Sequence, residues 1–194
     1  RRECLAEIAD CLPGGPLNLA LPESIVAGIV PHAGWVFSGE LAAMVFVAIK
    51  QVKQEPDTFI LFGAAHGCYD MCPVIFPEGS WETPLGQIEI DADLTSQLIA
   101  LGARPDAQAH RHEHSIEVQV PFIQHLFPKA ELVAAILPPA SNGYECDFGH
   151  KVGTLLKTKR INAICIASTD LTHYVPRYGL APKGTGQNGI HWAH

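Results

Sequence analysis

Three short apolar runs, each followed by a turn of small residues and then a histidine, constrain the fold of this chain more than any other feature. Residues 24–30, 58–62 and 161–167 are such runs, and helix-length segments lie between them. Continuous apolar runs of this length, rich in β-branched side chains, are typical of strands that are covered on both faces. The alternation predicts an α/β protein with a mostly parallel sheet.

The remaining segments complete this pattern. Shorter apolar runs predict strands over 73–76 and 132–137, and residues 81–91 are typical of a loop or hairpin. Periodic patterns predict helices over 39–52, 92–101, 115–126 and 146–157, the third interrupted near Pro121. Ser38 is the expected N-cap of the first helix, and a stripe is expected to face the core: Leu41, Val45, Ala48 and Val52. Residues 178–189 are expected to form a long loop.

Length and charge exclude several classes of protein. With 194 residues, 47% of them hydrophobic, the chain is expected to form a single domain, residues 1–194, that lacks a C-terminal segment. Its formal charge is 13 − 20 = −7, which argues against a nucleic-acid partner. Its apolar stretches fall short of the roughly 20 residues of a membrane helix, so we expect no membrane partner.

Six scattered cysteines in a chain of this length favour reduced thiols and a cytoplasmic location. Cys68 and Cys72 form a C-x3-C pair, but no second pair at zinc-finger spacing accompanies them. We interpret these two residues as packing residues rather than metal ligands.

The histidines that follow the three runs are His32, His66 and His173. Ligands bind at the carboxyl ends of parallel strands, so these side chains are expected to meet at one site. Metal ligation and acid–base chemistry both require such convergence. Asp170 lies three residues before His173, and it could either complete a site of two histidines and one carboxylate or orient the His173 ring. We favour the orienting role.

A histidine-rich segment, residues 109–114, precedes the predicted helix over 115–126. An alternating set, His110, His112 and His114, could form a metal clip if extended, although a solvated loop is the preferred interpretation. Glu113, His114 and Glu117 lie at the expected helix start, where they could point into the same cleft or serve as ordinary helix-entry residues. Phosphate-binding glycine loops and the Gly-x-Ser-x-Gly nucleophile motif are absent from the sequence.

Four segments together resemble the Memo family, whose bacterial and archaeal members are called AmmeMemoRadiSam system protein B. They are residues 31–39 (PHAGWVFSG), 63–66 (GAAH), 113–122 (EHSIEVQVPF) and 168–174 (STDLTHY). The family is similar in fold to the class III extradiol dioxygenases. The resemblance therefore implies a three-layer α/β/α sandwich with a mostly parallel central sheet and a non-haem metal site at the strand ends.

The resemblance also implies roles for individual residues. His32 and His66 would be metal ligands, and His173 would be the catalytic acid or base beside the metal, with the possibility of reaching it directly. Asp170, Glu113, His114 and Glu117 would line the cleft. A third protein ligand, Cys or Glu in such proteins, would come from a segment beyond His194.

The resemblance implies a non-haem, dioxygenase-like oxidoreductase. Fe(II) is the expected divalent metal, with Zn or Cu as alternatives. The substrate would be an unknown small molecule, and a catechol would suit the chemistry. A non-catalytic module that binds a metal or a peptide in the inherited cleft is the first alternative, and its rim could include Trp35, Phe37, Trp81 and Tyr174. A metal-dependent hydrolase is the second. The sequence does not define the oligomeric state.

Overall fold

A six-stranded sheet forms the centre of the computed structural model, which describes residues 1–67, 71–138, 143–174 and 176–193. The strand order is β1-β8-β2-β7-β3-β6. These strands are β1 (Ala27–Val30), β2 (Thr58–Ala64), β3 (Val74–Ile75), β6 (Arg104–Pro105), β7 (Glu131–Leu137) and β8 (Ala163–Ser168). Among the described strand pairs of this sheet, β3–β7 alone is antiparallel, which confirms a mostly parallel sheet.

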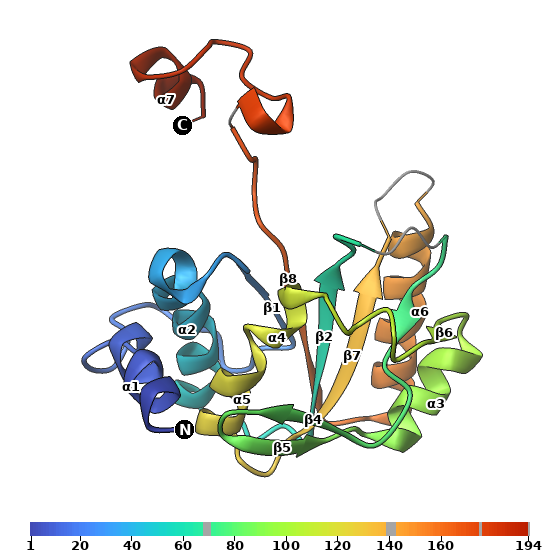
Figure 1. Cartoon of the computed structure of the whole chain (residues 1–194). Helices are drawn as coiled ribbons and strands as arrows, with labels where there is room; N and C mark the ends of the chain where they lie inside the picture. Colours follow the sequence, from blue (N-terminus) through green and yellow to red (C-terminus); the bar gives the residue numbers. More distant parts are fainter. Residues whose placement is uncertain (68–70, 139–142, 175, 194) are drawn as a thin grey trace.

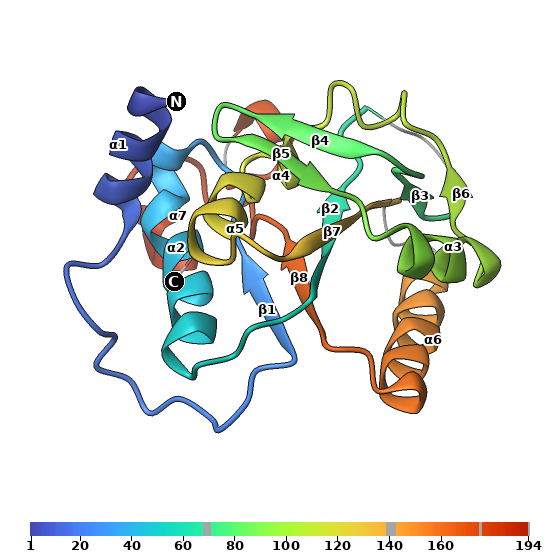
Figure 2. The ribbon, with the colours of Figure 1, turned by 90° about the horizontal axis from the view of Figure 1, so that it is seen from below.

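Helices cover both faces of the sheet, which confirms the three-layer α/β/α arrangement (Figure 1). On one side lie α1 (Arg2–Cys11), α2 (Trp35–Gln51), α4 (His114–Glu117) and α5 (Val120–Leu126). Figure 2 shows α3 (Ala92–Ala100) and α6 (Tyr144–Lys159) together on the other side. The hairpin of β4 (Ser80–Thr83) and β5 (Gly86–Glu89) confirms the predicted hairpin over 81–91.

The buried core has one part on each face of the sheet. Phe46 of α2, Phe59 of β2 and Phe122 of α5 pack in the first part, with Phe46 and Phe122 stacked at 5.9 Å. Phe148 of α6 and Leu98 of α3 pack in the second. None of the helices in the described ranges is long and apolar enough to cross a membrane.

Two predictions for the first helix differ from the structure. The α2 helix begins at Trp35, and Ser38 lies within it with its hydroxyl donating to the Ala33 carbonyl, so Ser38 is not the N-cap. The predicted stripe is only partly right, because Val45 packs against the core but Leu41 is 61% exposed, whereas Ala42 and Phe46, outside the stripe, are buried. The helix is apolar nearly all round, and its hydrophobic pattern therefore does not define the buried side.

Other boundaries differ from the predictions in smaller ways. The predicted helix over 115–126 consists of α4 and α5, and Pro121 occupies the first turn of α5, as its missing N–H allows. The predicted loop over 178–189 ends earlier than expected, because α7 (Gln187–Ala193) begins inside it. A short 3-10 helix, Pro176–Tyr178, precedes that loop. The segment after β8 leaves the sheet and runs away from the other elements (Figure 1).

Candidate metal centre

Three adjacent strands end at one edge of the sheet, and each is followed, two residues after its end, by a residue that can bind a metal or a proton. His32 comes two residues after the end of β1, and His66 comes two residues after the end of β2. The strand between them is β8, and the residue two positions after its end is Asp170. The carboxyl ends of parallel strands meet at one edge, so these three residues are brought together from distant parts of the sequence.

His114, the first residue of α4, joins the two strand-end histidines. The ring centroid of His114 lies 4.5 Å from that of His66 and 5.5 Å from that of His32, and the His32 and His66 centroids are 5.2 Å apart. One ligand atom from each ring lies within 4.8 Å of the other two. Imidazole nitrogen is a common ligand for Zn, Cu, Fe and Ni. This histidine cluster, His32, His66 and His114, could therefore hold a divalent metal.

His32 is the buried member of the cluster, with 2% of its surface exposed. Burial lowers the pKa of His32, because desolvation disfavours the charged ring, although the nearby Asp170 carboxylate opposes this. Asp170 Oδ1 accepts a hydrogen bond of 2.8 Å from the His32 backbone N–H, and Oδ2 lies 3.7 Å from His32 Nε2. A neutral ring is the form that binds a metal.

Glu113 fixes the position of His66. One carboxylate oxygen accepts a hydrogen bond from the His66 backbone N–H at 2.8 Å, and the other lies 2.9 Å from His66 Nδ1. Burial raises the pKa of Glu113, but hydrogen bonds from the backbone and side chains of His66 and Ser115 outweigh it and lower the pKa to about 2. An ionised Glu113 can only accept a hydrogen bond, so His66 Nδ1 carries the proton and donates it, which leaves His66 Nε2 available for a metal.

Hydrogen bonds to β2 hold α4 over the sheet edge. The Ser115 hydroxyl accepts from the Ala64 N–H at 3.0 Å and donates to the Ala64 carbonyl at 3.2 Å. Glu113 is the N-cap of α4, and its side chain accepts from the Ser115 N–H at 2.8 Å. Gly63 allows this close approach, because a Cβ there would lie 2.4 Å from Ser115 Oγ and 2.6 Å from Ile116 Cγ1.

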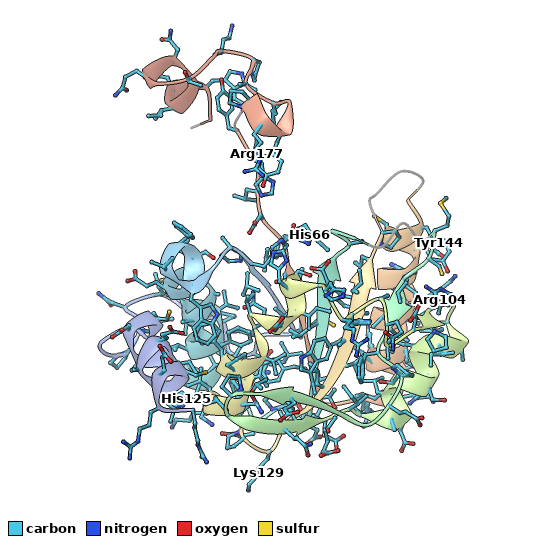
Figure 3. All side chains as sticks on the ribbon, in the orientation of Figure 1. His66, Arg104, His125, Lys129, Tyr144 and Arg177 are labelled. Carbon is cyan, nitrogen blue, oxygen red and sulfur yellow. The ribbon has the colours of Figure 1, made fainter. Side chains whose placement is uncertain are left out.

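His173, predicted to be a ligand or the catalytic acid or base, lies beside Asp170 instead of within the histidine cluster. Its Nε2 is 3.4 Å from Asp170 Oδ2, its side chain is 51% exposed, and its ring lies 4.9 Å from that of Tyr178. The contact with Asp170 fits the orienting role that we favoured for that carboxylate. Figure 3 shows His66 where the C-terminal segment leaves the sheet, and Arg177 farther along that segment.

The remaining candidates lie outside the cluster. Glu117 is exposed and lines surface grooves beside the β4–β5 hairpin. His110 is buried, with its Nε2 3.2 Å from the Val74 carbonyl, whereas His112 is exposed. His114 alone of the histidine-rich segment thus reaches the cluster, and the metal clip does not form. Cys68 lies outside the described residues.

Three of the four aromatic residues considered for a rim pack against other aromatic side chains. Trp35 packs on Phe122 at 5.0 Å and donates its Nε1–H to the Val118 carbonyl. Trp81 packs against the core beside Phe76, and Tyr174 packs on Trp192 in the C-terminal segment. Phe37 is 83% exposed. Packing therefore explains most of these side chains.

The comparisons with known proteins agree with the resemblance noted in the sequence. A family model described as "Memo-like protein" matches residues 7–190. A MEMO1 family protein of Thermococcus onnurineus is 40% identical over 164 residues, which cover 81% of this chain and 56% of the relative. Another, from Methanococcoides burtonii, is 36% identical over 172 residues, covering 88% of this chain and 62% of the relative. The chain thus spans somewhat more than half the length of these relatives, and it belongs to the Memo-like protein family.

Proposed function

We propose that this chain forms a non-haem iron centre with dioxygenase-like oxidoreductase activity. The observation that carries the proposal is the meeting of His32, His66 and His114 at the carboxyl ends of the strands. In an open α/β sheet this edge is where ligands bind. Two of the three histidine side chains are about half exposed, 42% for His66 and 51% for His114, so a substrate could reach the centre.

The donor set fits Fe(II). Imidazole nitrogens together with a carboxylate are typical donors of non-haem iron oxygenases. The three imidazoles would bind the ion, the Asp170 carboxylate lies beside them with Oδ2 3.7 Å from His32 Nε2, and Glu113 orients His66. Bound Fe(II) would supply open coordination positions and the redox chemistry with dioxygen. Zn and Cu suit the same imidazoles and are the alternative metals.

His173 and Asp170 are the proposed acid–base pair. The exposed His173 ring can take a proton from a substrate hydroxyl, and the ionised Asp170 would stabilise the resulting imidazolium through its contact of 3.4 Å. Burial raises the pKa of Asp170, but the His32 backbone N–H and the rings of His32 and His173 outweigh it and lower the pKa, which keeps this carboxylate ionised. A catechol, with two adjacent hydroxyls to bind and deprotonate, is the proposed substrate class.

Oxygen consumption tests this proposal. Full-length protein, loaded with Fe(II) under anaerobic conditions, is mixed with a panel of catechols in air-saturated buffer while dissolved oxygen is recorded. We expect oxygen uptake that depends on catechol, on Fe(II) and on His173. Turnover of an ester or amide under anaerobic conditions, supported equally by Zn, would contradict the proposal and indicate a hydrolase.

A binding module is the second candidate, and one observation favours it. Val36 and Phe37, in the first turn of α2 shortly after His32, are 87% and 83% exposed. Apolar side chains beside a cleft are suited to binding a peptide or a partner protein. Metal binding without oxygen uptake for any catechol would favour this candidate.

We also propose a cytoplasmic location and neither a nucleic acid nor a membrane as partner. Cys4, Cys11, Cys146 and Cys165 are free thiols, as is usual in a reducing compartment. The net charge of −7 disfavours binding to phosphate backbones.

A further inference from the structure

A buried cluster of hydrogen bonds lies next to His32. Gln119, which is fully buried between α4 and α5, donates from its side-chain amide to the Pro31 carbonyl at 2.8 Å and to the Ser168 hydroxyl at 3.0 Å. Ser168, the last residue of β8, is 2% exposed, and its hydroxyl lies 2.5 Å from the Ser115 carbonyl. The cluster therefore connects the ends of β1 and β8 to α4.

The direction of each hydrogen bond in this cluster is fixed. A carbonyl oxygen can only accept, so the Pro31 carbonyl requires the amide nitrogen of Gln119 and not its oxygen. The Ser115 carbonyl likewise takes the single proton of the Ser168 hydroxyl. Gln119 then donates to one lone pair of Ser168 Oγ. That oxygen consequently has only a lone pair left to offer to His32.

The remaining neighbour of Ser168 Oγ is His32 Nδ1, at 3.5 Å. Because Ser168 has no proton left to donate, a hydrogen bond between these two atoms requires the proton on Nδ1. In a neutral imidazole only one nitrogen is protonated, so Nε2 then carries the free lone pair.

The orientation of Gln119 has a cost that points to a specific role. Its Oε1 is buried and has no hydrogen-bond partner in the described ranges of the chain. Buried polar atoms are normally paired, and an unpaired one calls for an explanation. The explanation offered by the geometry is that the amide nitrogen is needed on the other side, where it sets the direction of the Ser168 hydroxyl.

We propose that Ser168 and Gln119 are positioning residues that hold His32 in its Nδ1–H form and present Nε2 as the metal-binding atom. Glu113 does the same for His66 through its contact of 2.9 Å with Nδ1. The neutral Ser168 hydroxyl and the ionised Glu113 carboxylate thus hold His32 and His66 in the same form, with the proton on Nδ1. The part of this inference that concerns metal binding rests on the proposed function. The position of the proton on the His32 ring does not depend on a metal.

Nitrogen NMR of the metal-free protein tests the proposal. Full-length protein labelled with 15N-histidine is studied by long-range proton–nitrogen correlation, which distinguishes protonated from unprotonated ring nitrogens, and His32→Asn identifies the His32 signals. We expect His32 with a protonated Nδ1 and an unprotonated Nε2. A His32 ring with its proton on Nε2 would overturn the proposal, and no variant of Ser168 is needed for this result.

Variants at the end of β8 provide the second arm. In Ser168→Ala the hydroxyl acceptor is lost, so the spectrum is expected to show a mixture of the two ring forms, and Co(II) affinity is expected to fall about 10–100-fold. If the alanine variant does not fold, Ser168→Cys, which preserves the volume, replaces it in the same two measurements. Thr169→Ala is the matched control, because Thr169 is exposed and its hydroxyl contacts only the Asp170 carbonyl, at 3.2 Å, among the hydrogen bonds described.

The two arms separate this inference from the proposed function. The expected ring form in a wild-type protein that binds no Co(II) would contradict the metal centre while supporting the role of Ser168. Unchanged ring form and unchanged affinity in Ser168→Ala would overturn that role even if the wild type binds metal tightly.

Discussion

Glu113 is the residue on which the geometry of His66 most directly depends. It is 4% exposed, and it holds both the backbone and the ring of His66. Its pKa of about 2 means that it is ionised throughout the physiological range. A buried carboxylate that accepts from a ligand histidine fixes the ring orientation and increases the basicity of the ligand nitrogen.

Glu113→Gln is therefore expected to weaken Co(II) binding by about 10–100-fold, because the neutral amide is a poorer acceptor for the Nδ1–H of His66. Isothermal titration calorimetry under anaerobic conditions measures the change. Glu117→Gln is the matched control, since Glu117 is an exposed glutamate on the same short helix. Equal affinities for the Glu113 variant and the wild type would show that Glu113 does not support the site.

His110 is a second residue with a strongly altered titration. Burial lowers its pKa to about 4, and the hydrogen bond to the Val74 carbonyl only partly opposes this. Its ring makes edge contacts of 5.8 Å with Phe76 and with Trp81. His110 therefore links the β4–β5 hairpin to β3 as a neutral ring.

The pKa of His110 predicts how stability changes with pH. Between pH 6.5 and about 4 the unfolded chain binds a proton at this residue that the folded protein does not. The free energy of unfolding is thus expected to fall as the pH decreases through this window, with about 3 kcal/mol of the loss due to His110. In His110→Phe this part of the slope should disappear in urea titrations, whereas His112→Phe, at an exposed position, should retain it.

At the scale of elements, the contact between β2 and α4 determines where His114 lies. Gly63 has no room for a side chain, because a Cβ there would meet both Ser115 and Ile116. In the same turn region, no atom of the described residues lies within 4 Å of the Cβ position of Gly67. The two glycines therefore form a natural pair for testing whether α4 must approach the strand this closely.

Gly63→Ala is expected to push α4 away from β2, to lower the free energy of unfolding by about 1–3 kcal/mol, and to weaken metal binding by displacing His114. Gly67→Ala is expected to change neither quantity. Chemical denaturation and a Co(II) titration measure the two effects. If the Gly63 variant were as stable as the Gly67 variant and bound metal as well, α4 would not depend on the close contact.

At the scale of the whole molecule, the sheet edge could be predicted from sequence more fully than the site above it. Strand-length apolar runs locate β1, β2 and β8, and the rule that ligands bind at strand ends selects His32 and His66. At the third strand the equivalent position holds a carboxylate, and the predicted histidine comes three residues later. Two residues after β8 the chain has Asp170, and His173 lies on the segment that leaves the sheet (Figure 1).

The sequence places His114 in the cleft, but it does not predict that His114 is a neighbour of the two strand-end histidines. Its position depends on hydrogen bonds between Ser115 and Ala64 and on the space at Gly63, and no periodic pattern reports such contacts. The buried face of α2 was likewise hidden, because apolar residues occupy nearly all of its sides. Contacts between distant segments, 138 residues apart for His32 and Asp170, complete the site.

The most direct test of the account is a comparison of His114→Ala with His173→Ala by anaerobic Co(II) titration of the full-length protein. We predict one metal per chain in the wild type and, for His114→Ala, an affinity loss of more than about 100-fold, since changes in residues that only orient ligands already cost about 10–100-fold. His173→Ala should bind Co(II) nearly as well as the wild type. Tight binding by His114→Ala together with lost binding by His173→Ala would contradict the histidine cluster as the metal centre.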